Sequence, residues 1–236
     1  MAMTKTQALR LLKEHRDERG VAHWQKRHAA ASGLRSFGIG LTKLRKLAKQ
    51  IGRDHRLSQQ LWNSDIYDAK IVGLLIDEPR LLTREQVEKQ VDDGLGAGLL
   101  VHVFASCDAT LAKAPFAFEL ACGWLDSPDA VRRQCGYSLL YELSKKNPPG
   151  MDDAFLLNRI EYIREHIHGE AKWGREAMNT ALMGIGKRNA MLNQAAIRAA
   201  QAIGPVDINY GDDNRCEPLD VLKHLTSDYL QKKLHG

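Results

Sequence analysis

Lysine and arginine side chains are the residues of this sequence whose types and spacing most clearly suggest a chemistry, the binding of phosphate groups. Eleven of them stand singly or in pairs on segments that we expect to be mostly helical: Arg45, Lys46, Lys70, Arg132, Arg133, Lys145, Lys146, Lys172, Arg175, Lys187 and Arg188. Contacts with DNA phosphates would release counterions, so binding would weaken steeply with salt. Because contacts with phosphates do not distinguish one base sequence from another, we expect the protein to prefer a DNA shape or a damaged site. The alternative for each side chain is a solvated helix face.

Other candidate groups have a structural explanation beside the chemical one. His102 could act as a general base, but its apolar neighbours favour a hydrogen-bonded interior histidine. The glycine-rich stretch 93–98 has no GK[ST] and no strand before it, which favours a connector between helices over a phosphate loop. Trp62, Trp124 and Trp173 could stack on bases, although packing between repeats is the usual role. Since no metal or nucleotide motif is present, we expect no metal, no nucleotide and no other cofactor.

Composition and charge place the chain among basic, helical proteins. Its 236 residues are rich in helix formers, and most of its prolines lie between apolar runs. The formal net charge of +5 suggests a polyanionic partner. Four cysteines form no CxxC pair and three of them lie among apolar residues, which indicates reduced core thiols. The sequence contains no signal-peptide pattern and no apolar stretch of membrane-spanning length, so we expect a cytoplasmic protein that does not enter membranes. We also expect a monomer.

Hydrophobic periodicity predicts about a dozen helices and no sheet. We expect helices over 4–19 and 22–31, one capped by Thr42, one over 83–93, three over 152–166, 172–187 and 190–203, and a closing helix from about Pro218. Helices of this length joined by short turns are typical of helical-repeat solenoids, here as a single domain over residues 1–236. A globular helical bundle is the alternative.

Three segments carry a resemblance to a known family: FGIGLTKLRKLAKQI at 37–51, LSQQLWNSDIYDAKIVGLLIDEP at 57–79, and WLDSPDAVRRQCGYSLLYELSKKN at 124–147. In their order and spacing they resemble the DNA alkylation repair family of HEAT-like repeat proteins, over about residues 35–220. The resemblance implies an all-α, C-shaped HEAT-like solenoid whose basic concave face binds duplex DNA. Some relatives are glycosylases that remove N3- or N7-alkylated purines and others lack that activity, a difference that the fold does not decide.

The resemblance also implies one candidate catalytic carboxylate. In the glycosylase relatives an Asp lies on a helix four residues after a Trp, and the nearest match here is Asp108, with Phe104 at the aromatic position. An alkylated purine is already a cationic leaving group, so the carboxylate would stabilise the positive charge that develops on the sugar. The match is incomplete, because Pro115 shortens the following helix and Met178 stands near the place of a second Trp. The structural alternative for Asp108 is a helix cap or a pair with Arg.

Three functions follow for such a chain. The first is a DNA glycosylase that uses Asp108, and the second is a non-catalytic relative that binds distorted or branched DNA. The third is a scaffold that grips a protein along its groove. Among the cations, Arg133 is the strongest candidate for a DNA contact, because it resembles the family's arginine after a W-x-x-S-x-D turn. The loop 209–216 either contacts DNA or holds the last helix in place.

Overall fold

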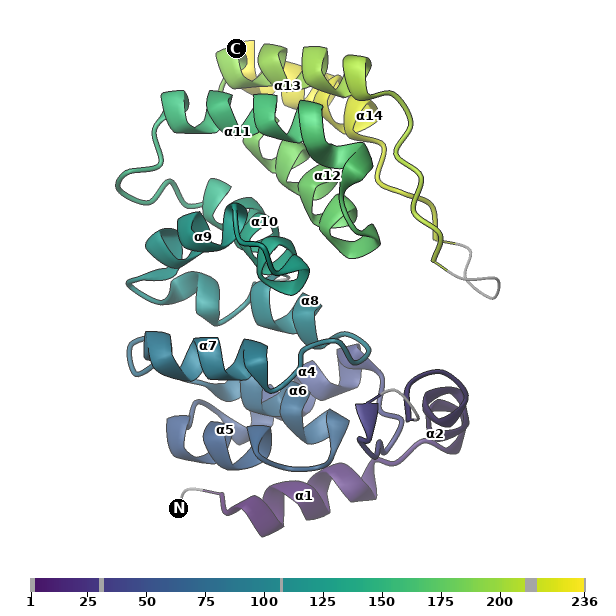
Figure 1. The fold of residues 1–236 in the computed structure, drawn as a ribbon. Helices are drawn as coiled ribbons and strands as arrows, with labels where there is room; N and C mark the ends of the chain where they lie inside the picture. The colour runs from purple at the N-terminus through teal and green to yellow at the C-terminus, as the bar shows by residue number, and fades with distance from the viewer. Residues whose placement is uncertain (1–2, 30–31, 107, 211–215, 236) are drawn as a thin grey trace. The chain divides into compact units, whose positions relative to one another are not determined.

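The computed structural model describes residues 3–29, 32–106, 108–210 and 216–235, and helices make up most of them (Figure 1). The described residues contain no strand, and their one isolated β-bridge joins Arg35 to Ile66. The chain forms two compact units, residues 1–116 and 117–236. Repeats contact mainly their neighbours, so two such units are compatible with the single domain that we predicted, which stays a prediction. None of the described helices is long and apolar enough to cross a membrane.

Unit 1, residues 1–116, is built around α6. Its elements are α1 (Lys5–Glu14), α2 (Glu18–Trp24), a π-helical turn (Gln25–Ala29), α4 (Leu41–Ile51), α5 (His55–Trp62), α6 (Tyr67–Ile76), α7 (Arg84–Asp92), α8 (Leu100–Ala105) and a 3-10 turn (Leu111–Lys113). Eight of the ten residues of α6 are buried, and α4, α5 and α8 all pack against it. At Gly73 a Cβ would lie 2.9 Å from the carbonyl oxygen of Ser58, so glycine lets α5 and α6 approach closely.

Unit 2, residues 117–236, is centred on α10. Its elements are α9 (Ala117–Leu125), α10 (Ala130–Ser144), α11 (Asp153–His166), a 3-10 turn (Ile167–Gly169), α12 (Lys172–Gly186), α13 (Ala190–Ile203), α14 (Val221–Leu225) and α15 (Asp228–His235). α10 packs against both α9 and α12. A Cβ at Gly184 of α12 would lie only 2.6 Å from the ring of Tyr141, so this glycine sets how closely the two central helices approach.

The helix boundaries confirm the later predictions more closely than the earlier ones. The range 190–203 is exact, and α11 and α12 each differ by one residue at one end. The helix predicted over 4–19 is two helices, because Asp17 caps a new one by accepting the N–H of Arg19 at 3.0 Å. Thr42 is not a cap, since α4 begins at Leu41 after Gly40, which offers no side-chain cap.

The C-terminal segment also differs from the prediction. Two helices replace the one expected from Pro218, and the first begins at Val221 after Asp220, whose carboxylate accepts the N–H of Lys223 at 2.9 Å. Most of the loop predicted at 209–216 lies outside the described residues, as does Cys107. Of the other cysteines, Cys135 is buried and Cys216 is exposed.

Candidate nucleic-acid interface

A buried carboxylate fixes the loop that leads into α4. Asp68 is fully buried and accepts the N–H groups of Phe37 at 2.7 Å and Ile39 at 2.9 Å, together with the Ser36 hydroxyl at 2.8 Å. Three donors offset the cost of burying the carboxylate, which would be large for an unpaired one. Asp68, which lies in the family-like segment 57–79, therefore orients α4. The sequence did not reveal this role, because the partners of Asp68 lie about thirty residues earlier in the chain.

Two cations follow each other along the solvent side of α4. Arg45 is half-buried and Lys49, one helical turn later, is exposed. With Arg53 and Asp108 they line a cleft of about 350 Å³. Like charges one turn apart destabilise a helix by about 0.2–0.5 kcal/mol. Neither Arg45 nor Lys49 forms a hydrogen bond or ion pair with another described residue, so both ends remain open to an anionic ligand.

Asp108 lies in a turn and not on a helix. α8 ends at Ala105, because Ser106 adopts an extended backbone, and Asp108 has φ 62°, in the left-handed region. The expectation of a helical Asp108 was therefore wrong. Its side chain is exposed within the α4 cleft, whereas Phe104 is only 3% exposed and belongs to the core. The structure does not bring these two candidate catalytic residues to one surface, and the buried Met178 offers no aromatic face either.

Arg133, the strongest sequence candidate for a DNA contact, is used inside unit 2. Its guanidinium binds the carboxylate of Glu170 through two hydrogen bonds of 2.6 and 2.8 Å. The remaining nitrogen donates to the carbonyls of Ser127 and Pro128 at 2.8 and 2.9 Å. The Glu170 side chain is 5% exposed and that of Arg133 22%. The hydrogen bonds from Arg133 hold the pKa of Glu170 below its usual value. The arginine thus joins α10 to the turn before α12, and four of its five N–H donors are used inside the protein.

Three more predicted cations are also occupied within the protein. Lys70 donates to the Trp62 carbonyl at 2.6 Å and lies 4.4 Å above the Trp62 ring, and burial lowers its pKa. Arg175 donates to three backbone carbonyls, those of His168, Glu170 and Asp207. Arg188 bonds to the Ser144 carbonyl and the Asn147 side chain. Their donors stabilise helix ends and turns, a role that spacing along the chain does not reveal.

Four further predicted cations lie at least partly at the surface. Lys46, Lys146 and Lys172 are exposed, and the half-buried Arg132 lies 4.0 Å from the Asp129 carboxylate that caps α10. Lys172 also lies 4.3 Å above the ring of Trp173. These positions allow contact with an anion, and whether they make one stays a prediction.

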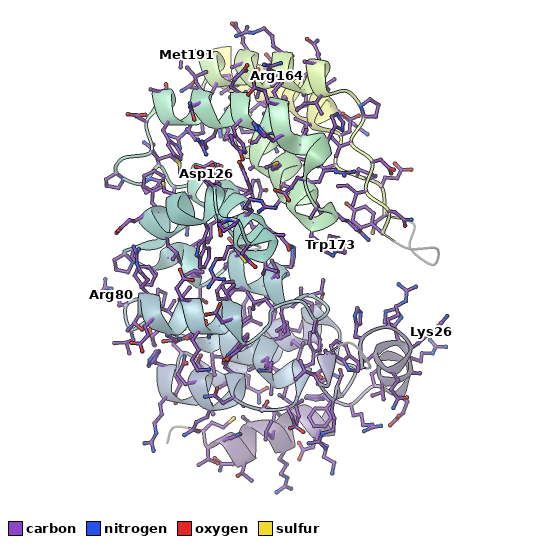
Figure 2. All side chains as sticks on the ribbon, in the orientation of Figure 1. Lys26, Arg80, Asp126, Arg164, Trp173 and Met191 are labelled. Carbon is purple, nitrogen blue, oxygen red and sulfur yellow. The ribbon has the colours of Figure 1, made fainter. Side chains whose placement is uncertain are left out.

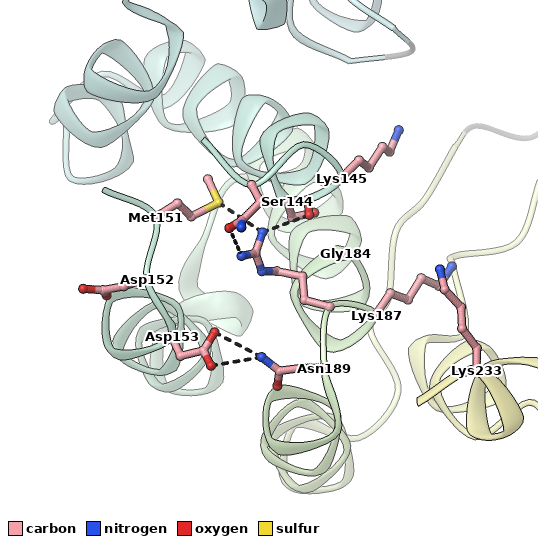
Figure 3. Close-up of a pocket in the computed structure, with 11 residues that line it drawn as sticks. Ser144, Lys145, Met151, Asp152, Asp153, Gly184, Lys187, Asn189 and Lys233 are labelled. Atoms are coloured by element: carbon pink, nitrogen blue, oxygen red, sulfur yellow. Dashed lines mark hydrogen bonds between the residues drawn. The ribbon is translucent and has the colours of Figure 1, made fainter. Parts of the chain in front are cut away.

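A second cationic cleft lies in unit 2, at the ends of α10 and α12 (Figure 3). It measures about 730 Å³, and its four cations are Lys145, Lys187, Arg188 and Lys233. Burial, and then the neighbouring charge of Lys145, lower the pKa of Lys187. Two acidic side chains share the cleft, but one caps α11 and the other accepts two hydrogen bonds from Asn189, of 3.1 and 3.0 Å. Both carboxylates keep their charge, so the four cations leave the lining with an excess of two positive charges, and one of the cations, Lys145, is paired with Glu142 at 2.9 Å.

The net positive charge of the chain belongs to unit 1. Residues 1–116 contain 19 Lys and Arg against 13 Asp and Glu, a net +6, whereas residues 117–236 contain 15 against 16, a net −1. An anionic partner would consequently be drawn mainly to unit 1. In unit 2 the attraction is confined to local clusters such as the second cleft.

The other candidates of the sequence analysis divide between core and surface. Trp62 and Trp124 are each 3% exposed and pack inside, but Trp173 is 45% exposed, against the expectation of packing. His102 is exposed on α8, so the interior position favoured for it was wrong. Within the described ranges no three His, Cys, Asp or Glu side chains are grouped as metal ligands would be.

Comparison with known proteins identifies the family of this chain. The model of a family described as DNA alkylation repair enzyme matches residues 8–212. The chain belongs to the DNA alkylation repair family. Two relatives, the uncharacterized proteins Lin0241 of Listeria innocua and Lmo0209 of Listeria monocytogenes, are each 25% identical over 206 residues, covering 84% of this chain and 85% of theirs.

A solved structure places the fold among HEAT-like repeats. It is described as a new family of proteins related to the HEAT-like repeat DNA glycosylases with affinity for branched DNA structures. The TM-score is 0.81 at 19% identity, over 98% of this chain and 96% of the other. This similarity confirms the all-α, HEAT-like repeat architecture, and the family match confirms the resemblance found in the sequence.

Proposed function

We propose that this member of the DNA alkylation repair family binds branched or distorted DNA and does not excise bases. The observation that carries the proposal is the row formed by Arg45 and Lys49, two like charges one turn apart that form no hydrogen bond or ion pair with another described residue. A helix that keeps such a pair loses a little stability, which a phosphate contact would recover. The net +6 of unit 1 supports the same conclusion, as does the affinity for branched DNA reported for its structural neighbour.

The electrostatics around Asp108 support binding without excision. Base removal from alkylated DNA needs a carboxylate facing a cationic base and a developing sugar cation, with aromatic faces beside them. In the α4 cleft the charged neighbours of Asp108 are Arg45, Lys49 and Arg53, which would repel a cationic purine. Phe104, the candidate aromatic residue, is buried in the core. Such a site suits a phosphate better than an alkylated base.

The experiment compares DNA affinities of two double variants that remove the same charge. We expect R45A/K49A to lower affinity for a three-way DNA junction about tenfold and to reduce the salt dependence of binding by about two phosphate contacts. The control, K5A/K13A, removes two lysines from α1 and should stay within about twofold of the wild type. Equal losses in both variants would mean that only net charge matters, and the α4 row would then not be the binding surface.

The stability of the same variants separates binding from folding. Because the α4 row contains repelling charges, R45A/K49A should unfold at the same urea concentration as the wild type, or at a slightly higher one. A clear loss of stability would show that the two side chains are structural, and the proposal would lose its main support.

Base excision is the second candidate function, and it rests on the exposure of Asp108 inside a cleft. Its test is release of free alkylated base from methylated duplex DNA, with wild type beside Asp108→Asn. Release that the substitution abolishes would make the protein a glycosylase and contradict the first proposal. We expect no release by either protein, together with salt-dependent DNA binding by both.

A further inference from the structure

A tryptophan of unit 2 remains at the surface. Trp173, the second residue of α12, is 45% exposed, whereas Trp24, Trp62 and Trp124 are between 3% and 5% exposed (Figure 2). Tryptophan carries more apolar surface than any other residue, so exposing nearly half of it is unfavourable in water. The other three tryptophans contribute to packing, and the packing of unit 2 does not account for this one.

The immediate neighbours of Trp173 are one cation and one aromatic ring. The ammonium of Lys172 lies 4.3 Å from the centre of the Trp173 ring. The ring of Tyr210 lies 6.1 Å away, inclined by 49°. The Tyr210 hydroxyl is held by the carboxylate of Glu176, one turn along α12, at 3.0 Å. An exposed indole, an adjacent tyrosine and a surface lysine thus occupy one patch, which we call the Trp173 patch.

We propose that the Trp173 patch is a stacking platform for an unpaired nucleobase. A nucleotide combines a flat aromatic base with a negative phosphate, and the patch combines an aromatic face with a positive ammonium. Stacking on exposed aromatic side chains, with lysine or arginine beside them, is how proteins bind single-stranded nucleic acid without reading its sequence. A fully paired duplex keeps its bases stacked on each other and would offer only phosphates to Lys172. The inference rests on the proposed binding of branched DNA, because a branch point is where unpaired bases occur.

Tryptophan fluorescence tests this directly, because Trp173 is the exposed one of four tryptophans. The probes are a single-stranded oligonucleotide, a three-way junction with unpaired thymines at the branch point, and a blunt duplex of matched length. We expect the first two to quench part of the emission and to protect it from acrylamide. The duplex should bind with little quenching. The quenchable part should be absent from Trp173→Phe.

Affinity measurements give a second, independent test. Trp173→Ala should weaken binding of the junction about 5- to 140-fold, the range for one base stacked on an aromatic side chain, and leave duplex binding unchanged. Trp173→Phe, which keeps a π face, should recover most of that loss. Met191→Ala is the matched control, since Met191 is 48% exposed and lies on α13 of the same unit, away from the patch (Figure 2).

The outcomes distinguish this inference from the function on which it rests. Junction binding that persists without quenching, and that Trp173→Ala leaves intact, would overturn the stacking platform and keep DNA binding by the α4 row. Quenching by the duplex equal to that by the junction would also overturn it, because an unpaired base would then not be needed. Absence of binding to all three probes would overturn both proposals.

Discussion

The pair formed by Arg133 and Glu170 leads to the sharpest prediction about this protein. The sequence predicts a DNA contact for Arg133, but in the structure its guanidinium makes four hydrogen bonds inside unit 2, two to Glu170 and two to the carbonyls of Ser127 and Pro128. Replacing Arg133 by Met keeps most of the aliphatic volume and removes the charge. The expected effect is therefore on the free energy of unfolding and not on DNA affinity.

The magnitude follows from burial. Removing one partner of a buried ion pair costs about 3–5 kcal/mol, because the other charge is left without compensation. Here the Arg133 side chain is 22% exposed and solvent can screen part of the interaction, so we expect about 2–4 kcal/mol. The exposed pair between Arg164 and Glu161 provides the control, and Arg164→Met should leave stability unchanged within error.

The assay is urea unfolding followed by circular dichroism, with the free energy obtained by linear extrapolation. Single variants Arg133→Met and Glu170→Gln and the double variant complete a thermodynamic cycle. The two single losses should add to clearly more than the loss in the double variant, because either substitution breaks the same contact. DNA affinity of the folded Arg133→Met protein should stay within about twofold of the wild type.

The pH dependence provides a further check with a defined sign. Arg133 lowers the pKa of Glu170 in the folded protein, so the pair contributes its full stability above the unfolded pKa of about 4.3. That contribution is lost as pH falls through the lower, folded pKa. The difference between wild type and Glu170→Gln should therefore be largest near neutral pH and shrink below about pH 4. The reasoning is refuted if Arg133→Met costs less than about 1 kcal/mol, or lowers DNA affinity while stability is unchanged.

Three further predictions concern the elements that position the two clefts. Asp68→Ala should lower the free energy of unfolding by about 2–4 kcal/mol, because three donors of the loop 36–39 lose their acceptor. Urea denaturation measures this loss, and a value below about 1 kcal/mol would mean that the loop does not depend on Asp68. Gly184→Ala should cost about 1–3 kcal/mol, since its Cβ would lie 2.6 Å from Tyr141, and an unchanged melting temperature would show that α10 and α12 separate freely. Asp108→Gly should leave the free energy of unfolding unchanged or raise it by up to about 1 kcal/mol, because φ 62° suits glycine. The substitution should also strengthen DNA binding, because it removes a negative charge from the α4 cleft. Weaker binding would indicate a direct role for the carboxylate.

Local signals in the sequence determined the helices of this protein. Apolar spacing, prolines between segments and capping side chains act over a few residues, which is why the range 190–203 was exact and the caps Asp152 and Asp129 begin their helices as such residues should. Where a cap was overlooked, as at Asp17, one predicted helix became two. The order and spacing of the motifs were also sufficient for the family resemblance, which the family match confirms.

The sequence by itself also indicated that lysine and arginine are the candidate ligand-binding side chains of this protein. Only the tertiary structure decided which of them are available to a ligand. Arg45 and Arg133 are alike in type and in helical context, yet one is open in a cleft and the other is held by a glutamate 37 residues later. Likewise, Trp62 and Trp173 look equivalent in the sequence and differ entirely in exposure. The physical reason is that a side chain's partners come from segments distant along the chain. Helix formation depends on neighbouring residues, whereas the availability of a charge or a ring depends on what the fold packs against it.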